Sequence, residues 1–99
     1  MARFDVYQGV GEPGYLLDCQ ADLLSELNTR FIVPLLPPDH APRAGERLNP
    51  NFEIDGETVV MVTQFAGSIP VHELGPAKAS LDHKHATIMN ALDMLLTGY

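Results

Sequence analysis

The histidines and the single cysteine are the side chains here that could ligate a metal ion or act as a nucleophile. His83 and His85 lie two residues apart in a segment with helical periodicity. That spacing directs the rings about 200° apart on a helix, whereas a zinc-binding pair on a helix lies at i and i+4. His72 and His40 lie in other segments. The pattern favours solvated polar residues, and we expect no metal and no cofactor.

Cys19 could serve as a nucleophile only with a general base beside it. Asp18 and Asp22 flank it, and their charge disfavours the thiolate. A free cysteine in an apolar segment is commonly a small buried hydrophobic residue. The sequence also lacks a glycine-rich phosphate loop, a nucleophile elbow and a paired-carboxylate motif. We therefore predict a binding protein rather than an enzyme.

The length of the chain bounds the number of domains, and its charge restricts the kinds of partner that it can bind. The 99 residues predict one domain, residues 1–99. Lys and Arg number 6 against 13 Asp and Glu, a formal charge of −7, which argues against binding nucleic acid or an anionic membrane. The chain has one cysteine, begins without an apolar signal core and contains no run of about 18 apolar residues. These features favour a cytoplasmic protein.

Residue patterns typical of β-strands occupy most of the chain. Asp55-Gly56 between two apolar runs predicts a hairpin with a type I′ turn. Pro34 predicts a strand end, an edge or a bulge. The expected strands are Phe4 to Gln8, Tyr15 to Cys19 (joined to the first by a turn over residues 9–14), Arg30 to Leu35, the pair within Asn51 to Val62, and Ser68 to His72.

The last segment changes to helical periodicity. Residues 80–96 contain no glycine or proline, Ser80 or Asp82 can cap the N-terminus, and Gly98 can end the helix. The apolar arc is wide for one small sheet, which predicts a C2 homodimer contact. That arc comprises Ile88, Met89, Ala91, Leu92, Met94, Leu95 and Leu96.

Two connections are open to more than one interpretation. Residues 22–27 predict either a short helical turn or a loop anchored by Leu23 and Leu24. Residues 37–46 predict a proline-rich surface loop, which is either functional or a variable excursion.

A resemblance covers nearly the whole chain. The sequence resembles the CcdB family of toxins from bacterial toxin–antitoxin pairs, with matching stretches in the family's order and spacing. They are Phe4–Tyr7, Leu17–Leu24, Arg30–Leu35, Leu48–Pro50, Asp55–Glu57, Met61–Thr63, Ser68–Val71, Leu81–His83, Ile88–Leu96 and Gly98.

The resemblance implies a fold and a way of acting. The implied fold is mainly β, an antiparallel SH3-like barrel or sheet with one C-terminal α-helix, assembled as a homodimer. Family members bind the A subunit of DNA gyrase and trap it with cleaved DNA, and a cognate antitoxin reverses this with a disordered segment. The implied activity is inhibition by binding, without catalysis.

The resemblance also implies site residues. The gyrase-binding positions are the last three, Trp-Gly-Ile in the family and Thr97, Gly98 and Tyr99 here. Thr97 cannot stack or bury the area of a tryptophan, which predicts a weaker gyrase poison. The implied antitoxin-binding residues are Gly9, Val10, Gly11, Glu12, Pro13, Gly14, Pro38, Asp39, His40, Arg43 and Glu46.

Two other functions compete with gyrase poisoning. The first is a non-toxic or weakly toxic homologue that keeps antitoxin binding and acts as a regulatory or decoy module. The second is an endoribonuclease, since the resemblance extends at fold level to RNA-cleaving toxins. The acidic charge and the scarcity of arginine argue against the endoribonuclease.

Overall fold

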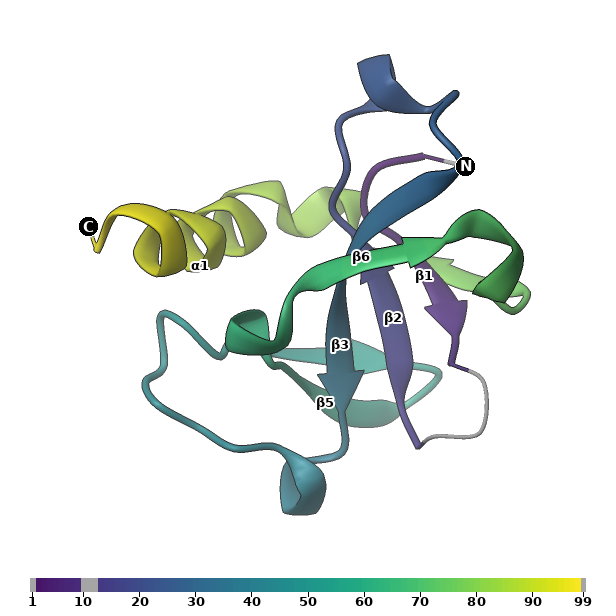
Figure 1. Ribbon diagram of the computed structural model, residues 1–99. Helices are drawn as coiled ribbons and strands as arrows, with labels where there is room; N and C mark the ends of the chain where they lie inside the picture. Colours follow the sequence, from purple (N-terminus) through teal and green to yellow (C-terminus); the bar gives the residue numbers. More distant parts are fainter. Residues whose placement is uncertain (1, 10–12, 99) are drawn as a thin grey trace.

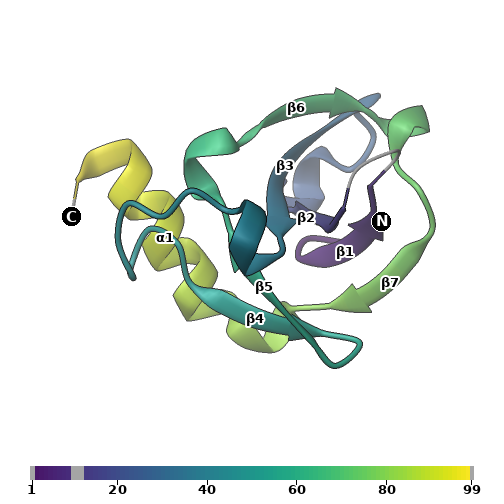
Figure 2. The ribbon, with the colours of Figure 1, turned by 90° about the horizontal axis from the view of Figure 1, so that it is seen from below.

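The computed structural model describes residues 2–9 and 13–98. Within these residues the fold is mainly β: seven antiparallel strands form a curled half-barrel sheet, with one C-terminal helix (Figures 1 and 2). The elements are β1 Asp5–Gln8, β2 Tyr15–Asp18, β3 Thr29–Leu36, β4 Asn51–Ile54, β5 Glu57–Met61, β6 Gly67–Pro70, β7 Ala77–Ser80 and α1 His85–Thr97. None of the helices in this part of the chain is long and apolar enough to span a membrane.

Strand β3 is the centre of the sheet. The strand order is β4-β5-β3-β2-β1-β7, and β6 also pairs with β3. On the side away from β2, β3 pairs with β6 through residues 29–32 and with β5 through residues 35–36. This change of partner curls the sheet, because β5 and β6 leave β3 in succession along the same edge (Figure 2).

Pro34 lies inside β3, so the prediction of a strand end, edge or bulge is wrong. A proline cannot donate to a ladder, and it is tolerated only where no donor is needed. Pro34 lies between the β6-paired and the β5-paired residues of β3, and its carbonyl accepts the Val62 N–H at 2.9 Å. Because Pro34 lies in the gap between the residues paired with β6 and those paired with β5, no N–H donor is needed at this position.

Both predicted hairpins are confirmed. β1 pairs with β2 from Val6 opposite Leu17 to Gln8 opposite Tyr15. β4 and β5 are joined by Asp55 with φ 51° and Gly56 with φ 80°. Positive φ at both central residues is the requirement of a type I′ turn, which the Asp-Gly pair satisfies.

The helix begins later than its periodicity predicts. Residues 77–80 form β7, a strand the sequence pattern missed, and Ser80 pairs with Asp5 of β1. Leu81 then donates its N–H to the Phe4 carbonyl at 2.8 Å. A 3₁₀ turn at Asp82–Lys84 precedes α1. The Ser80 hydroxyl oxygen accepts the Asp82 N–H at 3.2 Å at the start of this turn, as predicted for Ser80, but the N-cap of α1 itself is Lys84, which makes no side-chain capping bond. Pairing with β1 keeps this segment extended.

Other boundaries differ by a few residues. The strand expected at 68–72 ends at Pro70, because Val71–Glu73 form a 3₁₀ turn. Residues 22–24 form a 3₁₀ turn, and the interpretation of a loop anchored by Leu23 and Leu24 is wrong, since Leu23 is 93% exposed and Leu24 47%. The end of α1 at Gly98 is confirmed: Gly98 has φ 78° and donates its N–H to the Met94 carbonyl at 3.0 Å.

The main core lies between α1 and one face of the sheet. Alternate residues of a strand point to opposite faces. Val6, Leu17, Val33 and Leu35 share a buried cluster with the helix residues. The helix side of this cluster consists of Ile88, Ala91 and Leu92. The opposite face, enclosed by the curl of the sheet, buries Tyr7 and Ile32 and a pair of charges described below.

Cys19 follows β2 and packs against the core, as the sequence predicts. Burial, followed by the charge of Asp18, raises the pKa of its thiol to about 12 from 9.0. The folded protein therefore retains a proton that the unfolded chain releases above pH 9.

We expect the free energy of unfolding to fall as the pH rises from 9 towards 12, because only the unfolded state gains an ionised Cys19 in that window. Urea titrations at pH 8 and pH 10 measure this. The Cys19→Ala variant is the control and is expected to show a smaller fall. An equal fall in both proteins would assign the alkaline loss to other groups, such as Tyr7, whose pKa burial also raises.

Candidate partner-binding site

The C-terminal tip presents small and apolar groups beyond the sheet. α1 projects away from the half-barrel towards its C-terminus (Figures 1 and 2). Thr97 uses its hydroxyl within the helix, donating to the Asp93 carbonyl at 2.7 Å. Gly98 is exposed, and Leu96 is 74% exposed. Of the three predicted gyrase-binding residues, Tyr99 lies outside the described residues.

The last turns of α1 leave apolar side chains uncovered. Met94 is 40% and Leu95 39% exposed, whereas Ile88 and Ala91 are fully buried. The helix also packs against the 3₁₀ turn Thr63–Phe65. The apolar arc of α1 is therefore wider than the sheet it covers, as its sequence predicts.

The turn between β1 and β2 borders an apolar cleft of about 290 Å³. Three predicted antitoxin-binding residues, Gly9, Pro13 and Gly14, line it. The other predicted residues of this turn, Val10, Gly11 and Glu12, lie outside the described residues. The opposite walls are Tyr15, Leu16, Pro34, Leu36 and Phe65.

Phe65 is the cleft residue that sequence reasoning missed. It is 54% exposed, and it reaches the cleft from a 3₁₀ turn far along the chain. No local pattern marks it, because its place beside β2 and β3 arises only from tertiary folding. An exposed aromatic ring next to a cleft is a favourable anchor for a partner.

Gly14 can be no other residue without a shift of backbone. Its φ is 96°, and a Cβ atom there would lie 2.2 Å from the Leu35 carbonyl oxygen. The turn before β2 therefore lies directly against the end of β3 at the cleft, and the absence of a side chain at Gly14 permits this close approach.

The proline-rich connection that follows Leu36 is pinned by one buried amide. Asn49 is 2% exposed, and its Oδ1 accepts the Ala44 N–H at 2.7 Å. Its Nδ2 donates to the Met61 carbonyl at 3.1 Å and to Gln64 Oε1 at 2.7 Å. These bonds fix the connection to the end of β5, so the loop has a defined conformation.

The predicted antitoxin-binding residues of this loop all face solvent. Pro38, Asp39 and His40 form a 3₁₀ turn, and Arg43 and Glu46 follow. His40 Nε2 lies 3.9 Å from Asp39 Oδ2, and Arg43 donates to Asn51 Oδ1. The 3₁₀ turn begins two residues after Leu36 of the apolar cleft, so the cleft and the loop are adjacent along the chain.

A buried ion pair orders the strands behind these loops. Arg30 Nε and Nη2 donate to Asp18 Oδ2 at 2.9 and 2.6 Å, and both side chains are fully buried. Asp18 Oδ1 accepts the Gln20 N–H at 3.0 Å, and Gln20 Nε2 donates to the Leu24 carbonyl at 2.9 Å. The pair ties β2 to β3 and holds the loop that carries the exposed leucines.

Within residues 2–9 and 13–98 no three His, Cys, Asp or Glu side chains are grouped to hold an ion. His83 and His85 are exposed, as expected for a solvated first turn. His85 also packs edge-on against Phe4, with ring centroids 5.4 Å apart, and the Arg3 guanidinium lies over the Phe4 ring, 4.8 Å from its centroid. These contacts give His85 a structural role at the start of α1.

The fold and these surfaces define a class: a small acidic β-protein with an exposed apolar helix tip and an apolar cleft, suited to binding proteins. Residues 3–98 match the CcdB protein family, and the chain belongs to it. It is thus a toxin of the toxin–antitoxin type.

A solved structure shares the fold. It is described as an endoribonuclease in complex with its cognate antitoxin, from Mycobacterial species. The TM-score is 0.77 at 16% sequence identity, over 97% of this chain and 94% of that one. At this identity the likeness establishes the fold and leaves the target open.

Proposed function

We propose that this protein inhibits DNA gyrase by binding its A subunit through the C-terminal tip and trapping the cleaved-DNA complex. The observation that carries the proposal is the projecting end of α1, where Leu96, Thr97 and Gly98 are exposed beyond the sheet. The tip is free to enter a groove of a larger protein. The protein acts by binding in the cytoplasm and needs no cofactor, membrane or direct contact with nucleic acid.

Expression in a bacterial host, with three measurements together, tests this proposal. We expect arrested growth and trapped gyrase cleavage complexes, with intact cellular RNA. Deletion of residues 97–99 is expected to abolish the cleavage complexes while the fold, followed by circular dichroism, stays unchanged. Arrested growth with degraded RNA and no trapped gyrase would overturn the proposal.

An endoribonuclease is the second candidate, because the solved structure with the same fold is described as one. The charge distribution argues against it. Of the six Lys and Arg residues, Arg30 is fully buried on Asp18, which leaves five cations against an excess of carboxylates. Binding RNA requires a cationic surface. A decoy that binds antitoxin without toxicity is the third candidate, and normal growth with retained antitoxin binding would select it.

We propose that the cognate antitoxin covers the apolar cleft and the loop of residues 38–46. A disordered segment can become ordered when it binds along such a cleft and loop. Because the toxin is acidic, a segment with basic and apolar residues is favoured. We expect slower hydrogen exchange at Gly14 and His40 when antitoxin is bound. Helix residues Ile88 and Leu92, which are buried already, serve as the internal control. Unchanged exchange in both loops would remove them from the interface.

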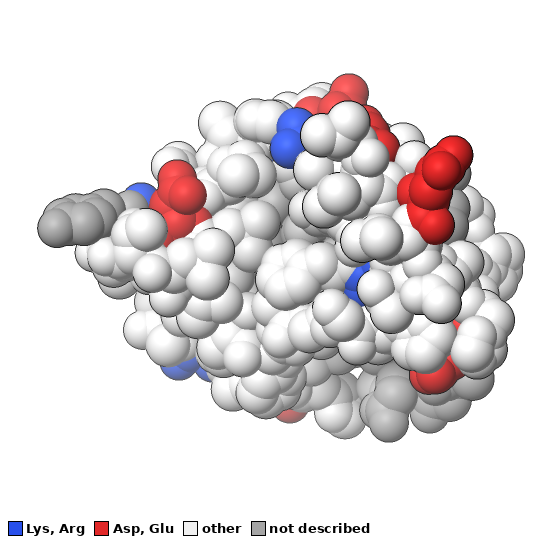
Figure 3. Space-filling view, turned by 45° about the horizontal axis from the view of Figure 1, so that its top comes forward, with Lys and Arg blue, Asp and Glu red and all other residues white. Residues whose placement is uncertain are grey.

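We propose a homodimer that buries the uncovered side of α1. Figure 3 shows a largely uncharged face, with acidic side chains towards its margins and a few cationic atoms among the uncharged ones. Exposed Met94 and Leu95 supply the apolar centre of a C2 contact. Light scattering at micromolar concentration is expected to give twice the 10.8 kDa chain mass. Leu95→Asp is expected to give monomers. Thr87→Asp, at an exposed position of the same helix, is the control and is expected to remain dimeric. A monomeric wild type would contradict the proposal.

A further inference from the structure

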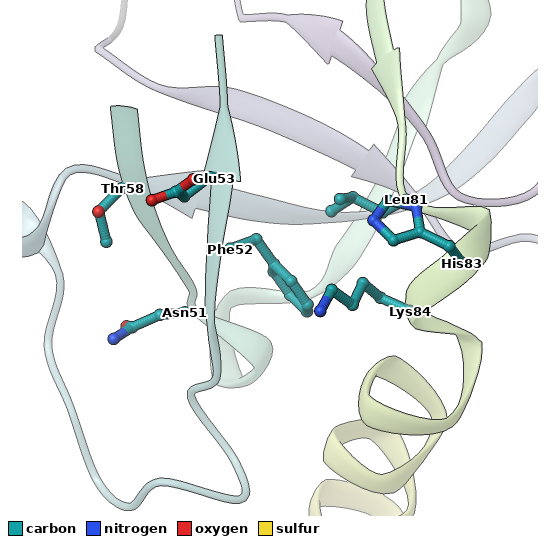
Figure 4. A pocket seen from close by; sticks show the side chains of 7 residues that line it. All are labelled: Asn51, Phe52, Glu53, Thr58, Leu81, His83 and Lys84. Atoms are coloured by element: carbon teal, nitrogen blue, oxygen red, sulfur yellow. The ribbon is translucent and has the colours of Figure 1, made fainter. Parts of the chain in front are cut away.

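The outer edge of β4 opens onto a polar cleft that none of the surfaces above uses. The cleft has a volume of about 530 Å³ and lies between β4 and the segment that precedes α1 (Figure 4). Asn51 and Glu53 of β4 form one side, and His83 and Lys84 the other. β4 ends the strand order, so within the described residues no strand pairs with this edge.

The hydrogen-bond phase of the β4–β5 hairpin shows which backbone groups face the cleft. Met61 donates its N–H to the Pro50 carbonyl at 2.9 Å, and the same register pairs Phe52 with Val59. Hydrogen-bonded and non-bonded pairs alternate along an antiparallel ladder. Phe52 therefore directs its backbone groups to β5, whereas Asn51 and Glu53 direct theirs outward. A row of free donors and acceptors is a template for another strand.

The side chains around this edge specify the partner's chemistry. Figure 4 shows Phe52 pointing across the cleft towards Lys84, while Glu53 points to the other face, beside Thr58. A residue directly opposite Glu53 on an added strand would share the face of Glu53. Asp55 and Glu57 extend the negative charge along the hairpin and are exposed. The matching residue is basic. Its neighbours, which would share the face of Phe52, are apolar, because they would lie against the Phe52 ring and a cation there would meet Lys84.

A second copy of this chain is the poorer occupant. Pairing of β4 with its own copy would bring the Glu53 carboxylates of both chains close together, and like charges on paired strands repel. We propose that the β4 edge binds an extended segment of another polypeptide by strand addition, with basic residues alternating with apolar ones.

An acetylated octapeptide of alternating Arg and Val is the probe. We expect it to slow hydrogen exchange at the Asn51 and Glu53 amides, since those N–H groups become bonded. The same peptide with alternate N-methylated residues, or with Glu in place of Arg, is expected not to bind. Absence of protection at both amides, or equal binding of the N-methylated peptide, would overturn the proposal.

Two variants test the site on the intact protein. Glu53→Pro removes only an outward donor and is expected to weaken peptide binding about tenfold. Glu53→Lys is expected to weaken it about fivefold, whereas Glu26→Lys, the same charge change on an exposed loop, leaves it unchanged. An equal loss of peptide affinity in Glu53→Lys and Glu26→Lys would show that only the net charge matters, and it would overturn the proposal. So would a dimer that Glu53→Pro dissociates, because it would make a second copy the occupant. None of these outcomes depends on gyrase or antitoxin.

Discussion

Asp18→Ala is expected to lower the free energy of unfolding by about 3–5 kcal/mol. The substitution leaves the Arg30 guanidinium fully buried without its carboxylate, and a buried charge without a partner is among the most costly defects in a folded protein. It also removes the acceptor of the Gln20 N–H. Urea denaturation followed by circular dichroism measures the loss.

Replacing both partners separates the cost of an unpaired charge from the value of the pair. Asp18→Val with Arg30→Met fills the same space with apolar groups, and we expect it to recover most of the stability, to within about 1–2 kcal/mol of wild type. Arg30 Nη1 finds no acceptor in the described part of the chain, so the native pair is incompletely satisfied. A double variant as unstable as Asp18→Ala would show that the pair itself contributes the stability.

This pair also shows why sequence reasoning was incomplete. Asp18 and Arg30 each lie in an apolar run, and only the pairing of β2 with β3, which sets Asp18 opposite Ile32, brings them together. A charged residue among β-branched neighbours was the available signal. This signal went unused, and it could not have said which residue is the partner.

Local chemistry made some elements predictable and left others unmarked. The Asp55-Gly56 turn and the Gly98 helix end depend on backbone conformations that few residues adopt, so a dipeptide or a single residue was enough. β7 contains Ala77, Lys78, Ala79 and Ser80, none of them a strong strand former, and is extended because it pairs with β1. Pairing with β1, rather than the strand propensity of its own residues, makes β7 a strand.

The candidate site follows the same division. The resemblance indicated the C-terminal tip as a candidate site, which stays a prediction, and composition located the glycine-rich turn between the first two strands. Phe65, which completes the apolar cleft, and the outward backbone of Glu53 could not be located in this way, because both depend on which strands are neighbours. Surfaces built from one segment were predictable, and surfaces shared between segments were not.

Thr97→Trp is expected to make the protein a stronger gyrase poison by about thirtyfold, or about 2 kcal/mol. The indole would bury about 150–250 Å² on a partner, which threonine cannot match. Position 97 ends α1 on an exposed turn, so the larger ring causes no clash with the sheet. Cleavage complexes formed with purified gyrase and supercoiled DNA, over a range of toxin concentrations, measure the change.

Thr97→Val is the matched control for this gain. It keeps the size of threonine and removes the hydroxyl bond to the Asp93 carbonyl, without adding a ring. We expect it to poison gyrase as weakly as wild type, which would assign the gain in Thr97→Trp to the aromatic surface. If wild type already traps gyrase as well as Thr97→Trp, position 97 is not the limiting contact. If both remain inactive while antitoxin still binds, the protein is a decoy, because the tip then fails even with the family's own anchor in place.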